Sequence, residues 1–89
     1  MLKTVAIEIT GKVQGVFFRK YTLQTGRRLN LCGFVRNLTD GSVYVEATGS
    51  ELQLKELVAW CHKGSPRAVV KQVLVRVISV IHKEPFQIL

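Results

Sequence analysis

The sequence predicts an α+β fold of the ferredoxin-like, split-βαβ class (βαββαβ), with two helices packed on one face of a mainly antiparallel sheet. Its hydrophobic pattern changes repeatedly between the period of two that is typical of strands and the 3.6-residue period of helices. An Asp-Gly pair separates the two central strand segments, as it does in β-hairpins. Because the chain has 89 residues and contains no linker or repeat, we expect one domain spanning residues 1–89.

The first strand and the first helix flank a segment that contains two glycines. Apolar residues occupy alternate positions from Val5 to Thr10, which indicates a half-buried strand. Gly11–Arg19 breaks this alternation. From Phe18 to Leu29 the pattern is helical, although Gly26 costs a helix interior about 1 kcal/mol relative to alanine.

A hairpin follows the first helix. Cys32–Leu38 is predicted as a short strand and Val43–Thr48 as its return strand, because apolar and polar residues alternate there. Between them, Asp40-Gly41 favours a tight turn, since glycine tolerates the positive φ that such a turn needs.

The second helix begins with a capping box, in which the side chains of Ser50 and Gln53 each pair with the other residue's backbone N–H. Apolar residues then recur at i, i+3, i+4 and i+7, and Gly64 is typical of the end of a helix. Val69–Ile81 is rich in β-branched residues and predicts a strand. The tail, Phe86–Leu89, can add a short strand after it.

Basic residues are concentrated in one stretch of the chain. The net charge is +7, and no acidic residue lies between Glu8 and Asp40. The same stretch holds six basic residues: Lys12, Arg19, Lys20, Arg27, Arg28 and Arg36. A segment of one sign attracts anions, so nucleic acid, anionic membranes and phosphorylated metabolites are all compatible with it, as is a plain solvated surface.

Neither the cysteines nor the apolar segments indicate secretion or membrane insertion. Cys32 and Cys61 form no CxxC pair, and two cysteines are too few for a disulfide scaffold. Their apolar neighbours favour two buried free thiols, although one bridge between them is also compatible with the sequence. Glu8 interrupts any signal-peptide-like run, and Arg76 interrupts Val73–Ile81. We expect a cytoplasmic protein without membrane association.

Few residues have the chemistry of a catalytic base or a metal ligand. Asp40 is the only aspartate and belongs to a turn, and the glutamates form no evident pair of the kind that two-carboxylate hydrolases use. His62 and His82 have no neighbouring carboxylate or cysteine set, so we predict surface or helix-terminus roles for both and no metal site. The chain contains neither a G-x-S-x-G elbow nor a Walker loop.

Gly11–Arg19 is the segment best suited to bind an anion. Glycines at both ends of its first half allow the backbone to curl so that successive N–H groups converge, and the following helix N-terminus adds positive potential. The Arg19 guanidinium can meet a phosphate with two parallel hydrogen bonds. An ordinary strand-to-helix loop with a solvent-exposed arginine explains the same residues about equally well.

Two motifs resemble those of the acylphosphatase family. Gly11–Arg19 reads GKVQGVFFR and matches the signature G-R/K-V-Q-G-V-x-F/Y-R, and Gly33–Val43 reads GFVRNLTDGSV and matches G-W/F-V-x-N-x-x-D-G-x-V. The similarity covers essentially the whole chain. The departures are modest: Phe34, Gly26 and Ser65 stand where the family commonly has Trp, Ala and Pro.

The resemblance implies hydrolysis of the carboxyl-phosphate bond of small acyl phosphates, without metal or cofactor. By the matching positions, Arg19 would hold the phosphate and Asn37 would orient the attacking water. The phosphate site would be completed by the backbone amides of Gln14, Gly15, Val16, Phe17, Phe18 and Arg19. Inorganic phosphate or sulfate would bind there as a product-like ligand, and we expect a monomer that acts without nucleic acid.

Two other functions are compatible with the residues. A ferredoxin-like module that binds nucleic acid would explain the charge, but Cys32–Val35 matches only a fragment of an RNA-recognition motif, and Tyr44 is the other candidate for base stacking. The second is a phosphate-binding module without turnover, or one that hands on carbamoyl phosphate, because the same signature occurs at the N-terminus of a large hydrogenase-maturation carbamoyltransferase. The length of the chain favours an independent enzyme, and the motifs leave the physiological acyl phosphate open.

Overall fold

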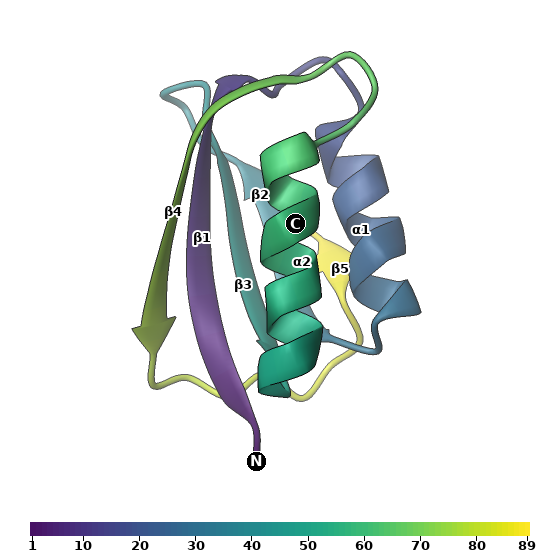
Figure 1. Cartoon of the computed structure of the whole chain (residues 1–89), viewed down its shortest axis with the longest axis vertical. Coiled ribbons are helices and arrows are strands. Elements are labelled where there is room, and N and C mark those ends of the chain that lie inside the picture. Colours follow the sequence, from purple (N-terminus) through teal and green to yellow (C-terminus); the bar gives the residue numbers. More distant parts are fainter.

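A five-stranded sheet carries both helices on one of its faces in the computed structural model, which describes residues 1–89 (Figure 1). The elements are, in chain order, β1 (Lys3–Lys12), α1 (Phe18–Arg28), β2 (Cys32–Asn37), β3 (Val43–Gly49), α2 (Glu51–Lys63), β4 (Val69–Ile78) and β5 (Gln87–Ile88). The strands lie in the order β4-β1-β3-β2-β5, and every pairing is antiparallel except that of β2 with β5. The predicted ferredoxin-like plan is confirmed, with the short β5 added at one edge.

The hydrophobic core fills the space between the sheet and the helices. Alternate residues of the central strands point into it, and Ile7 and Val45 are fully shielded from solvent. From α2, Leu57 is fully buried, so the predicted apolar stripe is the face that the helix turns toward the sheet. The ring of Phe18, at the start of α1, packs against Trp60 of α2 with the ring centroids 5.1 Å apart. The core therefore fixes the first turn of α1, where Arg19 lies.

A contact with the C-terminal segment explains the glycine inside α1. A Cβ atom placed on Gly26 would lie 2.6 Å from Cγ of Phe86, whose ring is fully buried. The Nε of Arg27 donates a hydrogen bond to the carbonyl oxygen of Phe86 at 2.9 Å. Helical propensity would favour alanine at position 26 by about 1 kcal/mol, but glycine leaves room for the ring that anchors the chain before β5.

The turns and caps agree with the sequence, whereas β4 is shorter than expected. Ser50 and Gln53 form both hydrogen bonds of the predicted capping box. The predicted Val69–Ile81 strand ends at Ile78, after which the backbone N–H of His82 donates to Oγ1 of Thr48 at 3.0 Å. That bond holds the segment leading to β5 against the sheet. Neither helix has the length and apolar composition that crossing a membrane requires.

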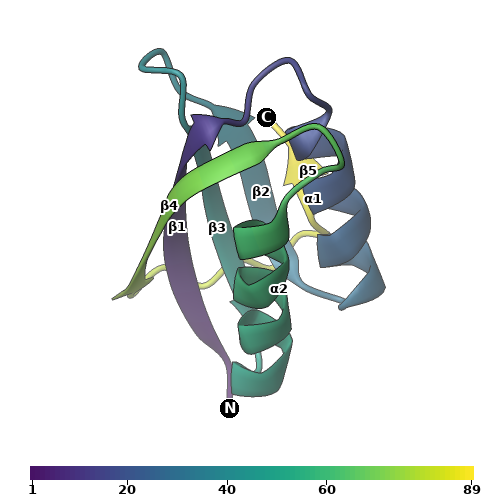
Figure 2. The same ribbon diagram turned by 45° about the horizontal axis from the view of Figure 1, so that its top comes forward.

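Several functional segments meet at one end of the molecule. Figure 2 shows the connection from β1 to α1, the turn between β2 and β3, and β5 with the C-terminus at the same end. The parallel pairing of β5 with β2 brings the last residues of the chain there, since Val35 lies opposite Ile88 and its carbonyl oxygen accepts from the Leu89 N–H at 2.9 Å.

Candidate active site

The β1–α1 loop, residues 13–17, curls back before α1 begins. Gly15 has a φ of 73°, a left-handed conformation that glycine adopts at no steric cost. Phe17, the N-cap of α1, is also left-handed at φ 61° and ψ 24°, which costs a residue with a side chain about 1–2 kcal/mol. No side chain caps the first turn of α1. Main-chain N–H groups at this turn therefore lack an intrahelical partner and are suited to an anion.

Gln14 ties this loop to the turn between β2 and β3. Its Nε2 donates to the carbonyl oxygens of Leu38 at 2.8 Å and of Ser42 at 2.9 Å. Within the same turn, the hydroxyl and the backbone N–H of Ser42 both donate to Oδ1 of Asp40. These hydrogen bonds, that of the hydroxyl foremost, hold the pKa of Asp40 below its usual value. Asp40 thus has the turn role that the sequence predicted.

A pocket of about 450 Å³ opens beside the loop. It is lined by residues from the loop, the first turn of α1, the end of β2 and β5: Val13, Gln14, Gly15, Phe17, Phe18, Arg19, Lys20, Asn37 and Ile88. Arg19 and Lys20 give the pocket positive charge, and no acidic residue lines it. A pocket of this kind attracts small anions.

Asn37 contributes a side-chain amide to the wall of the pocket. Asn37 is the last residue of β2 and pairs with Val43 of β3. Its Oδ1 is buried and has no hydrogen-bond partner within the protein. Leaving a buried acceptor unpaired costs about 1–3 kcal/mol. The Asn37 side chain lines the pocket, and its oxygen keeps an acceptor position that no group of the protein fills.

Most of the predicted site residues lie together at the pocket, but Val16 and Gly11 of the Gly11–Arg19 segment do not line it. Arg19 and Asn37 line the same pocket as four of the other predicted positions, but Val16 does not line it, and its side chain is buried in the core. Gly11 has a positive φ of 127°, but it lies in β1 rather than in the loop beside the pocket. Gly11 belongs to β1 and lies opposite Val70 of β4 at a register shift, where a Cβ would collide with the carbonyl oxygen of Val69.

Sequence reasoning missed Lys20 and Ile88. Lys20 directly follows Arg19 in the first turn of α1, so its place beside the pocket could have been inferred from the helix start. Ile88 reaches the pocket only because β5 pairs with β2. No local pattern indicates the partner of a two-residue strand, so the sequence carried no signal for this residue.

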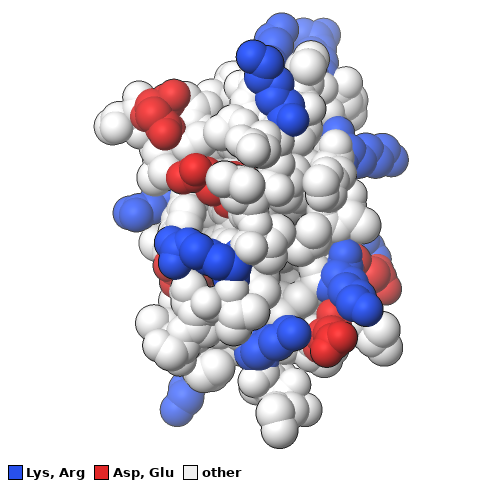
Figure 3. All heavy atoms as spheres, turned by 60° about the vertical axis from the view of Figure 1, so that its left-hand side comes forward, with Lys and Arg blue, Asp and Glu red and all other residues white.

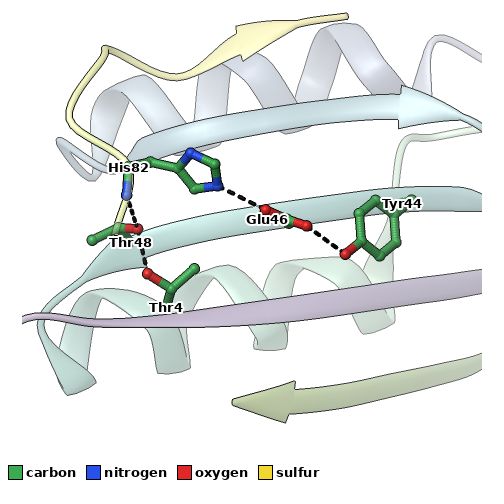
Figure 4. A network of polar contacts seen from close by, with 5 residues as sticks. All are labelled: Thr4, Tyr44, Glu46, Thr48 and His82. Atoms are coloured by element: carbon green, nitrogen blue, oxygen red, sulfur yellow. Dashed lines mark hydrogen bonds and ion pairs between the residues drawn. The ribbon is translucent and has the colours of Figure 1, made fainter. Parts of the chain in front are cut away.

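The structure gives His82 a single carboxylate partner that the sequence did not indicate. As Figure 4 shows, Nε2 of His82 lies 2.7 Å from Oε1 of Glu46, and the Tyr44 hydroxyl donates to Oε2 of the same carboxylate at 2.6 Å. Burial alone would raise the pKa of Glu46, but the hydrogen bonds from Tyr44 and His82, with the charges of His82 and Arg36, hold it below the usual value. None of these residues lines the pocket. The contact between His82 and Glu46 joins the segment after β4 to β3.

The remaining predicted groups have simple placements. Both cysteines are free thiols, and Cys61 is buried as expected, whereas Cys32 is only partly buried. Burial raises the pKa of Cys61 to about 12. No three His, Cys, Asp or Glu side chains are grouped so that they could hold a metal ion.

The sheet face that a nucleic-acid module would use carries little of the expected chemistry. The rings of Phe34 and Tyr44 lie 6.1 Å apart, but the Arg36 guanidinium already lies over both, 5.9 and 5.7 Å from the centroids. Figure 3 views the side of the molecule that carries β4, where Asp and Glu side chains lie among the Lys and Arg side chains. No basic stripe runs unbroken across that view.

Comparison with known proteins identifies the family. The Acylphosphatase family model matches residues 5–88. The acylphosphatase of Marinobacter nauticus is 55% identical over 65 residues, which are 73% of this chain and 71% of the relative. The acylphosphatase structures from Bacillus subtilis and Coxiella burnetii match with TM-scores of 0.94 and 0.93, each at 33% identity. These matches cover 100% and 98% of this chain, and 99% and 92% of the respective structures. The chain thus belongs to the acylphosphatase family.

Proposed function

We propose that the chain hydrolyses the carboxyl-phosphate bond of small acyl phosphates in the pocket between the β1–α1 loop and the end of β2. Membership of the family supports the reaction, and the positive charge of Arg19 and Lys20 supports the place. The observation that carries the proposal is that Arg19 and Asn37, a cationic donor and an amide whose oxygen has no partner within the protein, line one pocket that no acidic residue lines.

In this proposal the β1–α1 loop and Arg19 hold the phosphoryl group. Its equatorial oxygens gather negative charge as the bond to the leaving group weakens, and they are stabilised by N–H groups aimed at them. The main chain from Gln14 to Arg19 supplies such groups, and the Arg19 guanidinium adds two parallel donors. The Gln14 side chain takes no part, because both of its N–H bonds go to the β2–β3 turn.

Asn37 places the attacking water. Its side-chain amide forms a hydrogen bond with the water and leaves the water oxygen facing phosphorus, opposite the leaving carboxylate. The water oxygen forms a bond to phosphorus while the bond from phosphorus to the acyl oxygen breaks, and the electron pair leaves with the carboxylate. Asn is no base at neutral pH, so the water's proton passes to a phosphate oxygen. Positioning and charge stabilisation suffice, since an acyl phosphate is a labile mixed anhydride.

Hydrolysis of acetyl phosphate in excess chelator tests the proposal. We expect the parent protein to turn acetyl phosphate over at the same rate with and without chelator, and Arg19→Gln to lose the activity. A parent protein that binds inorganic phosphate but leaves acetyl phosphate intact would contradict it and identify a binding module without turnover. Activity that chelator abolishes and a divalent cation restores would contradict the metal-free reaction. We also expect the protein to be a monomer and to act in the cytoplasm. Analytical sedimentation would measure its oligomeric state.

A further inference from the structure

We propose that Lys20 is a second cation for the phosphoryl group, which strengthens substrate binding without accelerating the chemical step, and that the ring of Phe17 holds its ammonium group beside the pocket. The inference rests on the proposed hydrolysis in the same pocket. It adds to that proposal a residue that neither sequence motif includes, since the first motif ends at Arg19.

The first turn of α1 carries charges that a helix by itself disfavours. Arg19 and Lys20 both lie there, and the turn contains no acidic residue. The N-terminus is the positive end of the helix dipole, so cations destabilise this turn and acidic residues stabilise it. α2 follows the rule, with Glu51 in its first turn and Lys63 in its last. An anion bound beside the first turn of α1 would offset the repulsion.

No group of the protein neutralises Lys20. None of the ion pairs in the structure involves it, and no acidic residue lines the pocket to which it contributes. Other lysines do have partners, since Lys3 and Lys55 both pair with Glu51. The charge of Lys20 is therefore available to an anion in the pocket.

The ring of Phe17 restricts the positions that this charge can take. Nζ of Lys20 lies 5.9 Å from the ring centroid, within the roughly 6 Å over which a ring face attracts a cation. Phe17 is 70% exposed, so packing in the core does not account for its ring. Its backbone is left-handed, and strained residues are concentrated at ligand sites. A lysine already held beside the pocket loses less side-chain freedom when an anion binds.

The two cations should affect different constants of the reaction. The guanidinium of Arg19 offers donors in a fixed geometry, which can match a transition state. The ammonium group of Lys20 is a point charge on a flexible, exposed stem. Because the phosphoryl group is an anion in the substrate, the transition state and the product, Lys20 attracts all three. Binding that is equal in the ground state and the transition state lowers KM and leaves kcat as it is.

The Kd for inorganic phosphate, measured by calorimetric titration, and the KM and kcat for acetyl phosphate test the inference. At an ionic strength of about 0.1 M, Lys20→Gln should raise Kd and KM together by about three- to tenfold, with kcat within about twofold of the parent. At about 1 M the Debye length falls to about 3 Å, and Kd should then differ from that of the parent by less than about twofold. Lys20→Arg keeps the charge and should bind phosphate as the parent does.

Lys83→Gln is the matched control, because it makes the same change of charge at an exposed lysine that does not line the pocket. Lys83 belongs to the connection from β4 to β5, which lies at the opposite end of the sheet from the β1–α1 loop (Figure 1). All three constants should equal those of the parent. In a thermal melt without phosphate, Lys20→Gln should melt no lower than the parent, since it removes a cation from the positive end of α1.

Phe17 is a positioning residue in this proposal, because it acts through Lys20. Phe17→Leu keeps an apolar side chain and should raise the Kd for inorganic phosphate by about two- to fivefold, whereas Phe17→Tyr keeps the ring and should retain the parent value. When Lys20→Gln is already present, adding Phe17→Leu should leave Kd as it is. Inorganic phosphate has no acyl group, so contacts of the ring with that part of a substrate do not enter the measurement.

A Kd that Lys20→Gln leaves at the parent value overturns the inference, as does a fall in kcat while Kd is maintained. An equal effect of Phe17→Leu with and without Lys20→Gln overturns the role of the ring. A parent protein that binds phosphate but leaves acetyl phosphate intact overturns the proposed function, and the Kd of Lys20→Gln still decides the role of Lys20. A parent protein that binds no phosphate overturns both. Should Phe17→Leu fail to fold, Lys20→Gln and Lys20→Arg decide the inference.

Discussion

The side-chain nitrogen of Gln14 lies 2.9 Å from the carbonyl oxygen of Ser42, so that one amide group joins the β1–α1 loop to the turn after β2. The same nitrogen donates to the carbonyl oxygen of Leu38, the residue next to Asn37. The loop that leads to Arg19 and the residue that faces the pocket from β2 are thereby held in one fixed arrangement. Gln14 acts through its side chain as a brace, in addition to the main-chain role predicted for it.

Gln14→Ala should reduce both stability and turnover. The substitution removes two hydrogen bonds, each of which contributes about 0.5–1.5 kcal/mol to the free energy of unfolding, although the carbonyl oxygens of Leu38 and Ser42 keep a backbone donor each. The loop would also shift relative to Asn37, so kcat for acetyl phosphate should fall by about tenfold or more. Urea denaturation and steady-state kinetics measure the two effects. Gln24→Ala, on the exposed side of α1, is the control and should change neither.

Parent-like kcat in Gln14→Ala would show that the brace does not position the site. A loss of stability without a loss of kcat would have the same meaning for catalysis, while leaving the structural role of the two hydrogen bonds in place.

Glu46 should make the protein less stable in acid. A carboxyl whose pKa is lowered by folding contributes stability above its unfolded pKa and loses that contribution as the pH falls through its folded pKa. For Glu46 the decline begins near the ordinary glutamate value of 4.5 and continues below it. Denaturant titrations at neutral pH and at a series of pH values below 4.5 measure the slope, which Glu46→Gln should flatten.

The control for this experiment is Glu56→Gln, because Glu56 is 64% exposed and lies 3.9 Å from an equally exposed Arg28. Surface pairs of this kind contribute little. An identical acid slope in the parent and in Glu46→Gln would mean that the contacts with Tyr44 and His82 do not stabilise the charged carboxylate.

Cys61 should be unreactive in the native protein. Its side chain is fully buried, and burial raises the pKa of the thiol to about 12, so almost no thiolate forms at neutral pH. In Cys32→Ser, a thiol reagent should label Cys61 only after denaturant is added. Rapid labelling of this variant at neutral pH without denaturant would show that the core around α2 opens readily.

The elements that follow from local patterns were predicted from the sequence, and those that depend on distant contacts were not. The capping box at Ser50 and the Asp40 turn are local and were correct, as were both helices and the four long strands. Gly26 counted against α1 by propensity alone, because only the folded structure shows the ring of Phe86 against it. β4 ends before Ile81 for a similar reason, since His82 is bonded to β3.

The residues of the candidate site can likewise be separated into those that local motifs predicted and those that they did not. Arg19 and Asn37 belong to the two sequence motifs, and both line one pocket in the structure. Gly11 is different: its strand pairing with β4 cannot be read from the motif. Ile88 and the Glu46 partner of His82 come from segments far away in the chain, and no local pattern indicates such neighbours.

Arg19→Gln should weaken phosphate binding and catalysis together. Removing one preorganised donor from a developing oxyanion costs about 2.7–4 kcal/mol, and a bidentate guanidinium contributes at least as much. Turnover of acetyl phosphate should therefore fall by about a hundredfold or more, with a parallel loss of affinity for inorganic phosphate. Arg28→Gln, an exposed arginine at the end of α1, is the matched control and should retain both.

Asn37→Ala tests the central claim most directly, because Asn37 is proposed to orient the attacking water, whereas Arg19 and the β1–α1 loop are proposed to bind the phosphate. The measurement pairs kcat for acetyl phosphate with the Kd for inorganic phosphate in the same preparation. We predict a kcat at least about a hundredfold lower than that of the parent protein, with a Kd within about twofold of it. Hydrolysis at the parent rate, or a kcat and an affinity that fall together, would contradict the division of roles between these two residues.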